Sequence, residues 1–216
     1  MKSEPVVIVG SGGHAKVVIE LIRAEGKYQI LGCTGMVEGG SVLGDVPILG
    51  TDAVLPAVLA KGVKSAFVAI GDNRLRLRLL TQMSEMGFEL INAVSPNAVV
   101  SRSATLGRGI AIMAGAVINA SAQIGDGAII NTNAGVDHDC CIGNGAHIGP
   151  GSALAGNIEV GRETFLGVGT CVLPGIRIGS RAIIGAGSVV IRDIPDDVTA
   201  IGVPARIVSD VNTSPI

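Results

Sequence analysis

Aromatic residues are almost absent from this 216-residue chain: they make up 2% of it, and there is no tryptophan. A hydrophobic core must therefore be built from isoleucine, valine, leucine and alanine. Glycine is abundant instead, with 32 residues, which is roughly twice its usual share. The length is compatible with one substantial domain or with two small ones.

The chain also lacks any block rich in lysine and arginine, and its formal net charge is −2. This disfavours nucleic acids and acidic membrane surfaces as partners, because both attract basic patches. No uninterrupted apolar run approaches the ~20 residues that span a bilayer. The first residues, MKSEPVVIVG, lack the basic region and the cleavage site of a signal peptide. We expect a soluble, cytoplasmic protein that binds no nucleic acid and inserts into no membrane.

Paired cysteine spacings of the CxxC kind are missing as well. Without them, neither a disulfide framework nor a structural zinc site is predicted. A zinc site that combined Cys140 or Cys141 with a nearby histidine would lack the two-plus-two ligand spacing. We therefore expect no metal, and we expect the thiols to be small buried side chains. The four cysteines are Cys33, Cys140, Cys141 and Cys171.

The first 96 residues alternate between apolar runs and helical patterns. The run VVIVG, which begins at Val6, is followed by a glycine turn, a helical stretch and a second apolar run, YQILGC. This order is typical of a β-α-β unit. The alternation continues with a helix expected near residues 52–60, a strand over 65–70, a helix through RLRLRLLTQMSEMG and the run FELINAV. We predict a small parallel sheet flanked by helices, which ends near Pro96.

After Pro96 the hydrophobic period changes to six. Every sixth residue from Leu106 to Val190 is aliphatic, fifteen times in succession, which has a chance probability on the order of one in thirty thousand if half of all residues are apolar. The residue two places earlier is usually small, and every third aliphatic position is followed by glycine. One full turn therefore has eighteen residues in three sides. The aliphatic positions are Leu106, Ile112, Ile118, Ile124, Ile130, Val136, Ile142, Ile148, Leu154, Val160, Leu166, Val172, Ile178, Ile184 and Val190.

This hexapeptide repeat predicts a β-helix, in which each short strand bonds to the coils above and below and its aliphatic residue points inward. The fifteen sides make five coils, spaced ~4.8 Å apart along the axis. The flat faces of such a prism are candidates for self-association. The tail, IPDDVTAIGVPARIVSD, is expected to leave the repeat. The whole chain is therefore predicted to be α/β followed by all-β.

Several motifs carry a family resemblance: the repeat itself, VVIVGSGGHAK, FVAIGDNRLR, NTNAGVDHDC, GPGSALAGN and IGVPARIV. Together they resemble the nucleotide-sugar N-acetyltransferases and the related sialic acid O-acetyltransferases, over nearly the whole chain. The resemblance implies a Rossmann-like domain over residues 1–96 that binds a sugar nucleotide, and a left-handed β-helix over 97–216. It further implies acetyl-CoA as cosubstrate and a homotrimer with active sites between subunits. The reaction would acetylate the 4-amino group of a 4-amino-4,6-dideoxy sugar, as in GDP-perosamine or a UDP- or dTDP-linked analogue, in surface glycan synthesis.

The same resemblance assigns the catalytic residues. His138 would be the general base that takes the proton as the amine attacks the thioester, and Asp139 would orient its ring. Asp137 is the less favoured orienter, because the family pattern uses the residue after the histidine. Gly156 lies eighteen residues after His138, one coil away, and its N–H would face the developing oxyanion. The alternatives are a satisfied polar residue at a coil corner for His138 and a simple corner glycine for Gly156.

The second solenoid histidine, His147, comes nine residues after His138, which is half a coil. Within one chain it would face away from His138, so the two share a site only across a subunit interface. The resemblance places His147 near acetyl-CoA and Asn131 near the acceptor, although Asn131 could instead be satisfied by the backbone. As a pair of metal ligands the histidines are disfavoured. The remaining coenzyme contacts are implied at Gly156, Val168, Ala186 and residues 202–206, including Pro204.

The loop GSGGHA, from Gly10 to Ala15, fits the pattern G-x-G-x-x-G/A, and its backbone N–H groups would suit a phosphate at a helix start. An NAD site also expects an acidic residue at the end of the second strand, where this chain has CTG, followed only later by Glu38. Dinucleotide binding is therefore disfavoured, and a sugar nucleotide fits better. The acid-poor turn also departs from many relatives, which loosens any inference about the base. The implied substrate contacts are Gly12, Gly13, His14, Asp72, Asn73 and Asn131.

Some of these assignments have competing interpretations. His14 could be an exposed first-turn histidine, and Asp72 with Asn73 could form a helix cap rather than a pocket wall. At the level of function, an O-acetyltransferase acting on a sialic acid would use the same frame and mechanism. A trimeric scaffold without activity would keep the solenoid but would not need His138.

Overall fold

The computed structural model describes residues 3–36 and 42–210, which form two compact units divided between Pro96 and Asn97. Glu38, the acidic residue noted above, lies outside the described residues. Within these ranges, no helix is long and apolar enough to cross a membrane.

The first unit is an α/β sheet built around β1. Its strand order is β3-β4-β2-β1-β5-β6, and β1 pairs in parallel with both β2 and β5. The elements are β1 (Glu4–Val9), α1 (Gly13–Glu25), β2 (Tyr28–Thr34), β3 (Val42–Leu43), β4 (Val46–Gly50), η1 (Asp52–Val54), α2 (Leu55–Ala60), β5 (Ser65–Val68), α3 (Asn73–Met86), β6 (Glu89–Leu90) and β7 (Ala93–Val94).

The predicted parallel sheet has one antiparallel strand in addition, at its edge. β3 runs antiparallel to β4, and the two strands form a hairpin that turns at Gly44, whose φ is +64°. The hairpin escapes sequence reasoning because β3 has only two residues and no alternating pattern. The strand expected over 65–70 also ends earlier, at Val68.

Helix α3 of this unit begins and ends where the sequence provides caps. The side chain of Asp72 accepts a hydrogen bond from the N–H of Leu75 and so caps the start of α3. Gly87 ends the same helix in the left-handed conformation, with φ +97°. Apolar residues of β1 and β5, such as Val9 and Val68, pack with α3 side chains such as Leu80 in a buried cluster.

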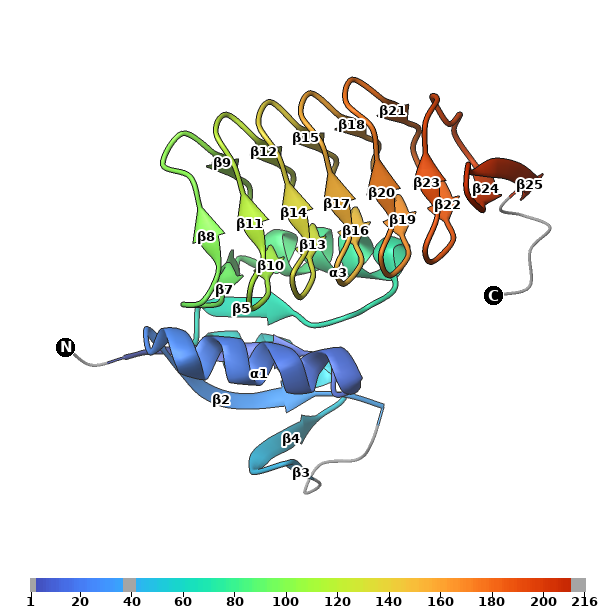
Figure 1. Ribbon diagram of the computed structural model, residues 1–216. Helices are drawn as coiled ribbons and strands as arrows, with labels where there is room; N and C mark the ends of the chain where they lie inside the picture. The colour runs from blue at the N-terminus through green and yellow to red at the C-terminus, as the bar shows by residue number, and fades with distance from the viewer. Residues whose placement is uncertain (1–2, 37–41, 211–216) are drawn as a thin grey trace. The chain divides into compact units, whose positions relative to one another are not determined.

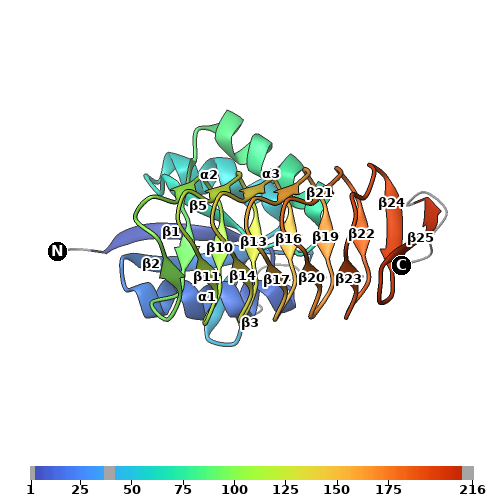
Figure 2. The same ribbon diagram turned by 45° about the horizontal axis from the view of Figure 1, so that its top comes forward.

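The second unit is a parallel β-helix with three faces (Figure 1). Face one contains β10, β13, β16, β19, β22 and β24 in one continuous row (Figure 2), face two β8, β11, β14, β17, β20 and β23, and face three β9, β12, β15, β18 and β21. The strands are β8 (Val99–Val100), β9 (Thr105–Leu106), β10 (Ala111–Ile112), β11 (Val117–Ile118), β12 (Gln123–Ile124), β13 (Ile129–Ile130), β14 (Gly135–Val136), β15 (Cys141–Ile142), β16 (His147–Ile148), β17 (Ala153–Leu154), β18 (Glu159–Val160), β19 (Phe165–Leu166), β20 (Cys171–Val172), β21 (Arg177–Ile178), β22 (Ile183–Ile184), β23 (Val189–Val190), β24 (Val198–Ile201) and β25 (Arg206–Asp210).

The strand register follows the eighteen-residue turn read from the sequence. Ile112 pairs with Ile130, and Ile130 with Ile148. From Ile112 to Val190 every sixth residue is buried, whereas Leu106 in the first coil is only partly buried. The glycine that recurs once per turn has a steric cause: a Cβ on Gly143 would lie 2.7 Å from the backbone N of Arg162 in the next coil.

The tail does not leave the repeat where we expected. Ile194 bridges to Ile178, and β24 pairs in parallel with β22, with Ile184 opposite Ala200. These partners are sixteen residues apart rather than eighteen, so the last coil is two residues shorter and falls out of the six-residue frame. Of the strands in residues 194–210, β25 alone departs from the coil, because it turns back antiparallel to β24.

The expectation that all cysteines are buried was half wrong. Cys33 and Cys140 are buried, but Cys141 and Cys171 are exposed. Both exposed cysteines precede an inward-pointing aliphatic residue in their strands, so the alternation of a strand turns them outward.

Candidate functional site

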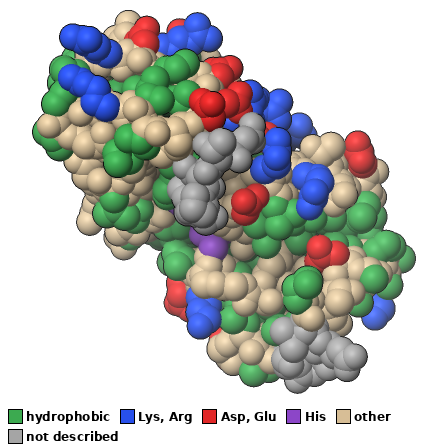
Figure 3. Space-filling model, turned by 90° about the vertical axis from the view of Figure 1, so that its right-hand side faces the viewer, with side chains coloured by type: hydrophobic (Ala, Val, Ile, Leu, Met, Phe, Trp, Pro, Cys, Tyr) green, Lys and Arg blue, Asp and Glu red, His purple; other side chains and the backbone are tan. Residues whose placement is uncertain are grey.

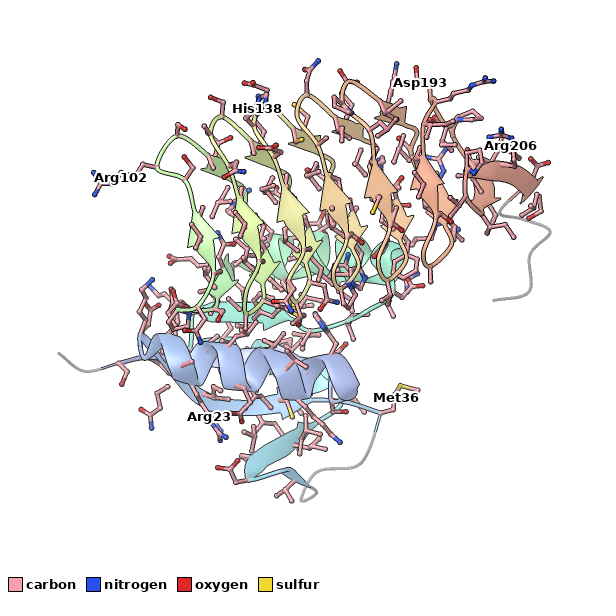
Figure 4. All side chains as sticks on the ribbon, viewed as in Figure 1. Arg23, Met36, Arg102, His138, Asp193 and Arg206 are labelled. Carbon is pink, nitrogen blue, oxygen red and sulfur yellow. The ribbon has the colours of Figure 1, made fainter. Side chains whose placement is uncertain are left out.

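His138 occupies the corner between β14 and β15, where its side chain projects outward from the solenoid and is 58% exposed (Figure 4). Its Nδ1 donates a hydrogen bond to Oδ2 of Asp139 at 2.7 Å. The adjacent carboxylate can turn back to the ring because Asp139 has a left-handed backbone, with φ +60°, a conformation that aspartate adopts more readily than most residues. The backbone N–H of Asp139 is held by the carbonyl of Ala120 in the coil before it.

These contacts set the protonation of the ring. The hydrogen bond to Asp139, and then the charge of Asp137, raise the pKa of His138 above its ordinary value. With its proton on Nδ1, the neutral ring presents the lone pair of Nε2 to whatever binds beside it. The arrangement is that of an oriented general base.

Gly156 lies directly against this ring. A Cβ built on Gly156 would be 2.5 Å from both Cε1 and Nε2 of His138, and the next residue, Asn157, donates its N–H to the carbonyl of His138. Within the described residues the N–H of Gly156 makes no hydrogen bond. The residue that lies against the ring thus has a backbone N–H without a partner among the described residues, and an oxyanion needs a donor of this kind.

His147 and Asn131 form a second cluster at another part of the prism. His147 is on β16 of face one, and Nδ2 of Asn131 donates to its Nε2 at 2.9 Å. The ring of Phe165 meets the His147 ring edge-on, with centroids 5.1 Å apart. The Oδ1 of Asn131 accepts the N–H of Thr132, so backbone satisfaction and the contact with His147 occur together. The structure pairs Asn131 with His147, on a different corner from His138.

Two of the residues expected to contact the coenzyme, Val168 and Ala186, stack along the edge beside Asn131, whereas Gly156 lies at the corner of His138. Backbone hydrogen bonds join Gly151 to Thr132 and Gly187 to Val168, so this corner repeats from coil to coil. Val168 is exposed, and Ala186 follows it by eighteen residues. On the side of the molecule drawn in Figure 3, hydrophobic side chains (green) reach the surface between charged ones (blue and red). Exposed apolar side chains of the described residues include Val168, Ile201, Val203 and Ile207, and Pro204 follows Val203 through a cis peptide bond.

In the first unit the glycine loop leads from β1 into α1. Gly10, with φ +114°, makes a close turn, since a Cβ there would lie 2.8 Å from the carbonyl O of Ala69. Around Gly12 and Gly13 no atom lies within 4 Å of an added Cβ, and no side chain caps the start of α1. The first N–H groups of this helix therefore suit an anionic group.

His14 is partly buried rather than exposed, so the interpretation of it as an exposed first-turn residue was wrong. Its Nε2 is buried and has no hydrogen-bond partner within the described residues. Burial, and then the charge of Arg76, lower the pKa of His14 from 6.5 to about 4. The ring is therefore neutral at physiological pH and has one buried nitrogen without a partner among the described residues, a feature that needs a structural or functional explanation.

Arg76 is a residue that sequence reasoning missed. It is fully buried, and its guanidinium donates to the carbonyls of Ile70 and Gly71 and to Oδ1 of Asn73. Burial lowers its pKa to about 10, against an opposing effect of Asp72. Asn73 and Asp72 thus brace the turn after β5, and the helix-cap interpretation of Asp72 has a direct structural basis. The available signal was an arginine on the apolar face of α3.

The carboxyl end of β2 has an acidic group after all. Oγ1 of Thr34, the last residue of β2, donates to Oδ1 of Asp52 at 2.5 Å. Asp52 comes eighteen residues later, after β4, so a search for an acid immediately after the second strand does not find it. The lack of an acidic residue immediately after β2 in the sequence is therefore not by itself an argument against dinucleotide binding.

The low pKa of His14 makes a direct prediction. Because its folded-state pKa is depressed, the unfolded chain takes up a proton that the folded chain refuses. The stability that neutral His14 contributes is therefore complete above about pH 6.5 and is lost as the pH falls toward 4. NMR titration should show the His14 ring still neutral at pH 5.5. The thermal midpoint of the His14→Gln variant should fall less between pH 7 and pH 5 than that of the parent; an ordinary titration near 6.5 would contradict this account.

Among residues 3–36 and 42–210, no group of three or more histidine, cysteine, aspartate or glutamate side chains is placed to hold a metal ion.

Comparisons with known proteins agree with both units. The family described as "PglD N-terminal domain" matches residues 5–83, and "Bacterial transferase hexapeptide (six repeats)" matches residues 121–156. A curated relative, the UDP-N-acetylbacillosamine N-acetyltransferase of Bacillus subtilis (strain 168), is 59% identical over 97% of each chain.

Solved structures extend this similarity to the whole fold. The perosamine N-acetyltransferase of Caulobacter crescentus, in complex with CoA and GDP-perosamine, has 54% identity and a TM-score of 0.92, covering 95% of this chain and 97% of that one. The acetyltransferase domain of PglB from Neisseria gonorrhoeae, in complex with acetyl coenzyme A, has 38% identity and a TM-score of 0.90, covering 96% of this chain and 100% of that one.

Proposed function

This chain belongs to the hexapeptide-repeat family of acetyl-CoA-dependent sugar N-acetyltransferases, and from this premise we propose that it acetylates a nucleotide-linked amino sugar. The acceptor would be the 4-amino group of a 4-amino-4,6-dideoxy sugar. Two relatives support this substrate class, since one is named for UDP-N-acetylbacillosamine and another was solved with GDP-perosamine. They differ in nucleotide, so the base carried by the substrate of this chain stays open among UDP, GDP and dTDP.

The observation that carries the proposal is the cluster of His138, Asp139 and Gly156. The amine attacks the thioester carbonyl while Nε2 of His138 takes its proton, and Asp139 holds Nδ1 and stabilises the charged ring. The N–H of Gly156 stabilises the oxyanion of the tetrahedral intermediate. When that intermediate collapses, CoA leaves as a thiolate and takes up the proton that His138 accepted from the amine, so that the ring is neutral again. The required donor, acceptor and orienting carboxylate lie together at one corner.

The raised pKa of His138 has a consequence for this mechanism. Only the neutral ring can accept a proton, so the rate should rise with pH until His138 is deprotonated. Because Asp139 and Asp137 raise the pKa, this rise should extend above the ordinary range of a histidine. A base of unperturbed pKa would reach its full rate at lower pH.

We assign the coenzyme to the edge that contains His147, Val168 and Ala186, continuing to residues 202–206 with Pro204. Exposed apolar side chains along this edge suit the pantetheine arm and adenine. His138 and His147 lie on different sides of the prism, so a site that uses both needs a second copy of the chain. A homotrimer with sites between subunits, as the resemblance implies, meets that need, with Asn131 beside His147 at the same junction.

For the sugar nucleotide we propose the start of α1. Gly12 and Gly13 leave room for a phosphate, and His14 has an unsatisfied nitrogen there. The turn that contains Asp72 and Asn73 is braced by Arg76 and would serve as a wall. A cytoplasmic location follows from this proposal, because acetyl-CoA and nucleotide sugars are cytoplasmic metabolites.

The test is thiol release from acetyl-CoA with a panel of acceptors. We expect release with at least one UDP-, dTDP- or GDP-linked 4-amino-4,6-dideoxy sugar, and none when the sugar is omitted. Mass spectrometry of the product should show one acetyl group on nitrogen. Release only with a sialic acid would reassign the reaction to O-acetylation, and no release with any acceptor would favour a scaffold.

A further inference from the structure

Asp137 lies beside His138 and is tied to the coil before it. One oxygen, Oδ1, accepts a hydrogen bond from Nδ2 of Asn119 at 2.9 Å and another from the backbone N–H of His138 at 2.8 Å. Asn119 precedes Asp137 by eighteen residues, so the two side chains stack one coil apart. The same oxygen therefore links the main chain of His138 to the neighbouring coil.

The backbone around this pair is also held. The N–H of Asn119 donates to the carbonyl of Val136, and that of Asp137 donates to the carbonyl of Leu154. The hydrogen bonds from the His138 N–H and then from Asn119 hold the pKa of Asp137 below its usual value. The carboxylate is therefore ionised wherever His138 titrates, and it adds a fixed negative charge beside the ring.

Asp137 and Asp139 act on different parts of the histidine. Asp139 binds the ring at Nδ1, whereas Asp137 binds the main chain and makes no described contact with the ring. Both contribute to the raised pKa of His138, with Asp139 first. The neighbouring coils contribute Ala120 on one side and Gly156 with Asn157 on the other, and none of these side chains titrates.

We propose that Asn119 and Asp137 form a positioning pair for His138, in which Asp137 fixes the main chain of the base and stabilises its protonated form, and Asn119 fixes Asp137. The inference rests on the proposed role of His138 as general base. Neither residue touches the reacting atoms, so both act through His138.

Three substitutions separate the parts of this role. Asp137→Asn keeps an oxygen that can accept both hydrogen bonds but removes the charge. Asp137→Ala removes the charge and the acceptor. Asn119→Ala removes only the hydrogen bond from Nδ2 of Asn119 to Asp137. The matched control is Asp126→Asn, because Oδ1 of Asp126 likewise accepts a backbone N–H, that of Arg108, but at a corner that follows face three and without effect on His138.

The first measurement is an NMR titration of the histidine rings in the full-length protein, which needs no substrate. We expect the pKa of His138 to fall in Asp137→Asn and to stay at the parent value in Asp126→Asn. The rings of His14 and His147 serve as internal reporters of folding. An unchanged His138 titration in a folded Asp137→Asn protein would overturn the charge effect.

The second measurement is the pH profile of acetyl transfer. In Asp137→Asn the acid side of the kcat profile should move to lower pH, and in Asp137→Ala kcat should also fall by about tenfold while KM changes less than about twofold. The kcat of Asn119→Ala should lie between the kcat values of Asp137→Asn and Asp137→Ala. If instead the variants lose substrate affinity and thermal stability to a similar degree, and the pH profile of kcat does not move, the role of the pair is purely structural. If the parent protein proves inactive, the proposed function fails, but the NMR titration still decides the contribution of Asp137.

Discussion

His138→Ala is expected to lower kcat for acetyl transfer by about 10²–10⁴-fold, the usual contribution of a positioned general base. The variant loses the imidazole whose Nε2 lies against Gly156, which is the group placed to accept the proton of the attacking amine. KM for both substrates should change much less, because the imidazole acts on the developing charge. Steady-state thiol release at several pH values measures both constants.

The control for this prediction is the stability of the variant. The His138 side chain is 58% exposed, so its removal should leave the thermal midpoint nearly unchanged. The pH dependence of the residual activity should also lose the rise that reports the titration of His138. Retention of more than a tenth of the parent kcat would mean that the substrate amine loses its proton to water or to another group, and that His138 only lines the site.

Gly156→Ala is expected to lower kcat by at least about 10²-fold, since a displacement of the order of 1 Å in a catalytic group is enough for such a loss. The new Cβ would lie 2.5 Å from Cε1 and Nε2 of His138, which is closer than the atoms can approach. Gly156 does not have a positive φ, so alanine is compatible with its backbone. The exposed ring of His138 must move instead, and the stability should change by less than about 1 kcal/mol.

A double-mutant cycle distinguishes the two roles that Gly156 could have. If the alanine acts by displacing the ring, it should cost little further activity in the His138→Ala background. An equal loss in both backgrounds would show that the methyl group disturbs the oxyanion donor or the acetyl group itself. A Gly156→Ala variant with parental kcat would contradict both, and would leave Gly156 as a corner glycine.

Much of this protein is determined locally, and for that reason it could be predicted from the sequence. A β-helix repeats one short side, so the inward aliphatic residues recur every six positions, and glycine recurs where the next coil leaves no room for a Cβ, as at Gly143. The turn of eighteen residues then predicted, from the sequence alone, that Gly156 lies beside His138. The same arithmetic placed His138 and His147 on different sides of the prism.

Other features depend on contacts between residues whose spacing has no regular pattern. The last coil has partners sixteen residues apart, so Ile194 and β24 leave the six-residue frame and stay in the solenoid. Asp52 reaches Thr34 at the end of β2 only because β4 pairs with that strand. Arg76 is buried because nearby carbonyls accept its hydrogen bonds, a compensation that composition cannot reveal.

The tertiary structure decided where the two carboxylates that flank His138 point. By spacing they are equivalent neighbours, at equal distance along the chain, and only the family pattern favoured Asp139 as the residue that orients the ring. The left-handed backbone of Asp139 turns its carboxylate to the ring, whereas the stacking of Asn119 holds Asp137 against the main chain. The sequence determines which residues share a corner, because that depends on a regular period. The direction in which each side chain points depends on backbone angles and on partners one coil away, and these exist only in the folded chain.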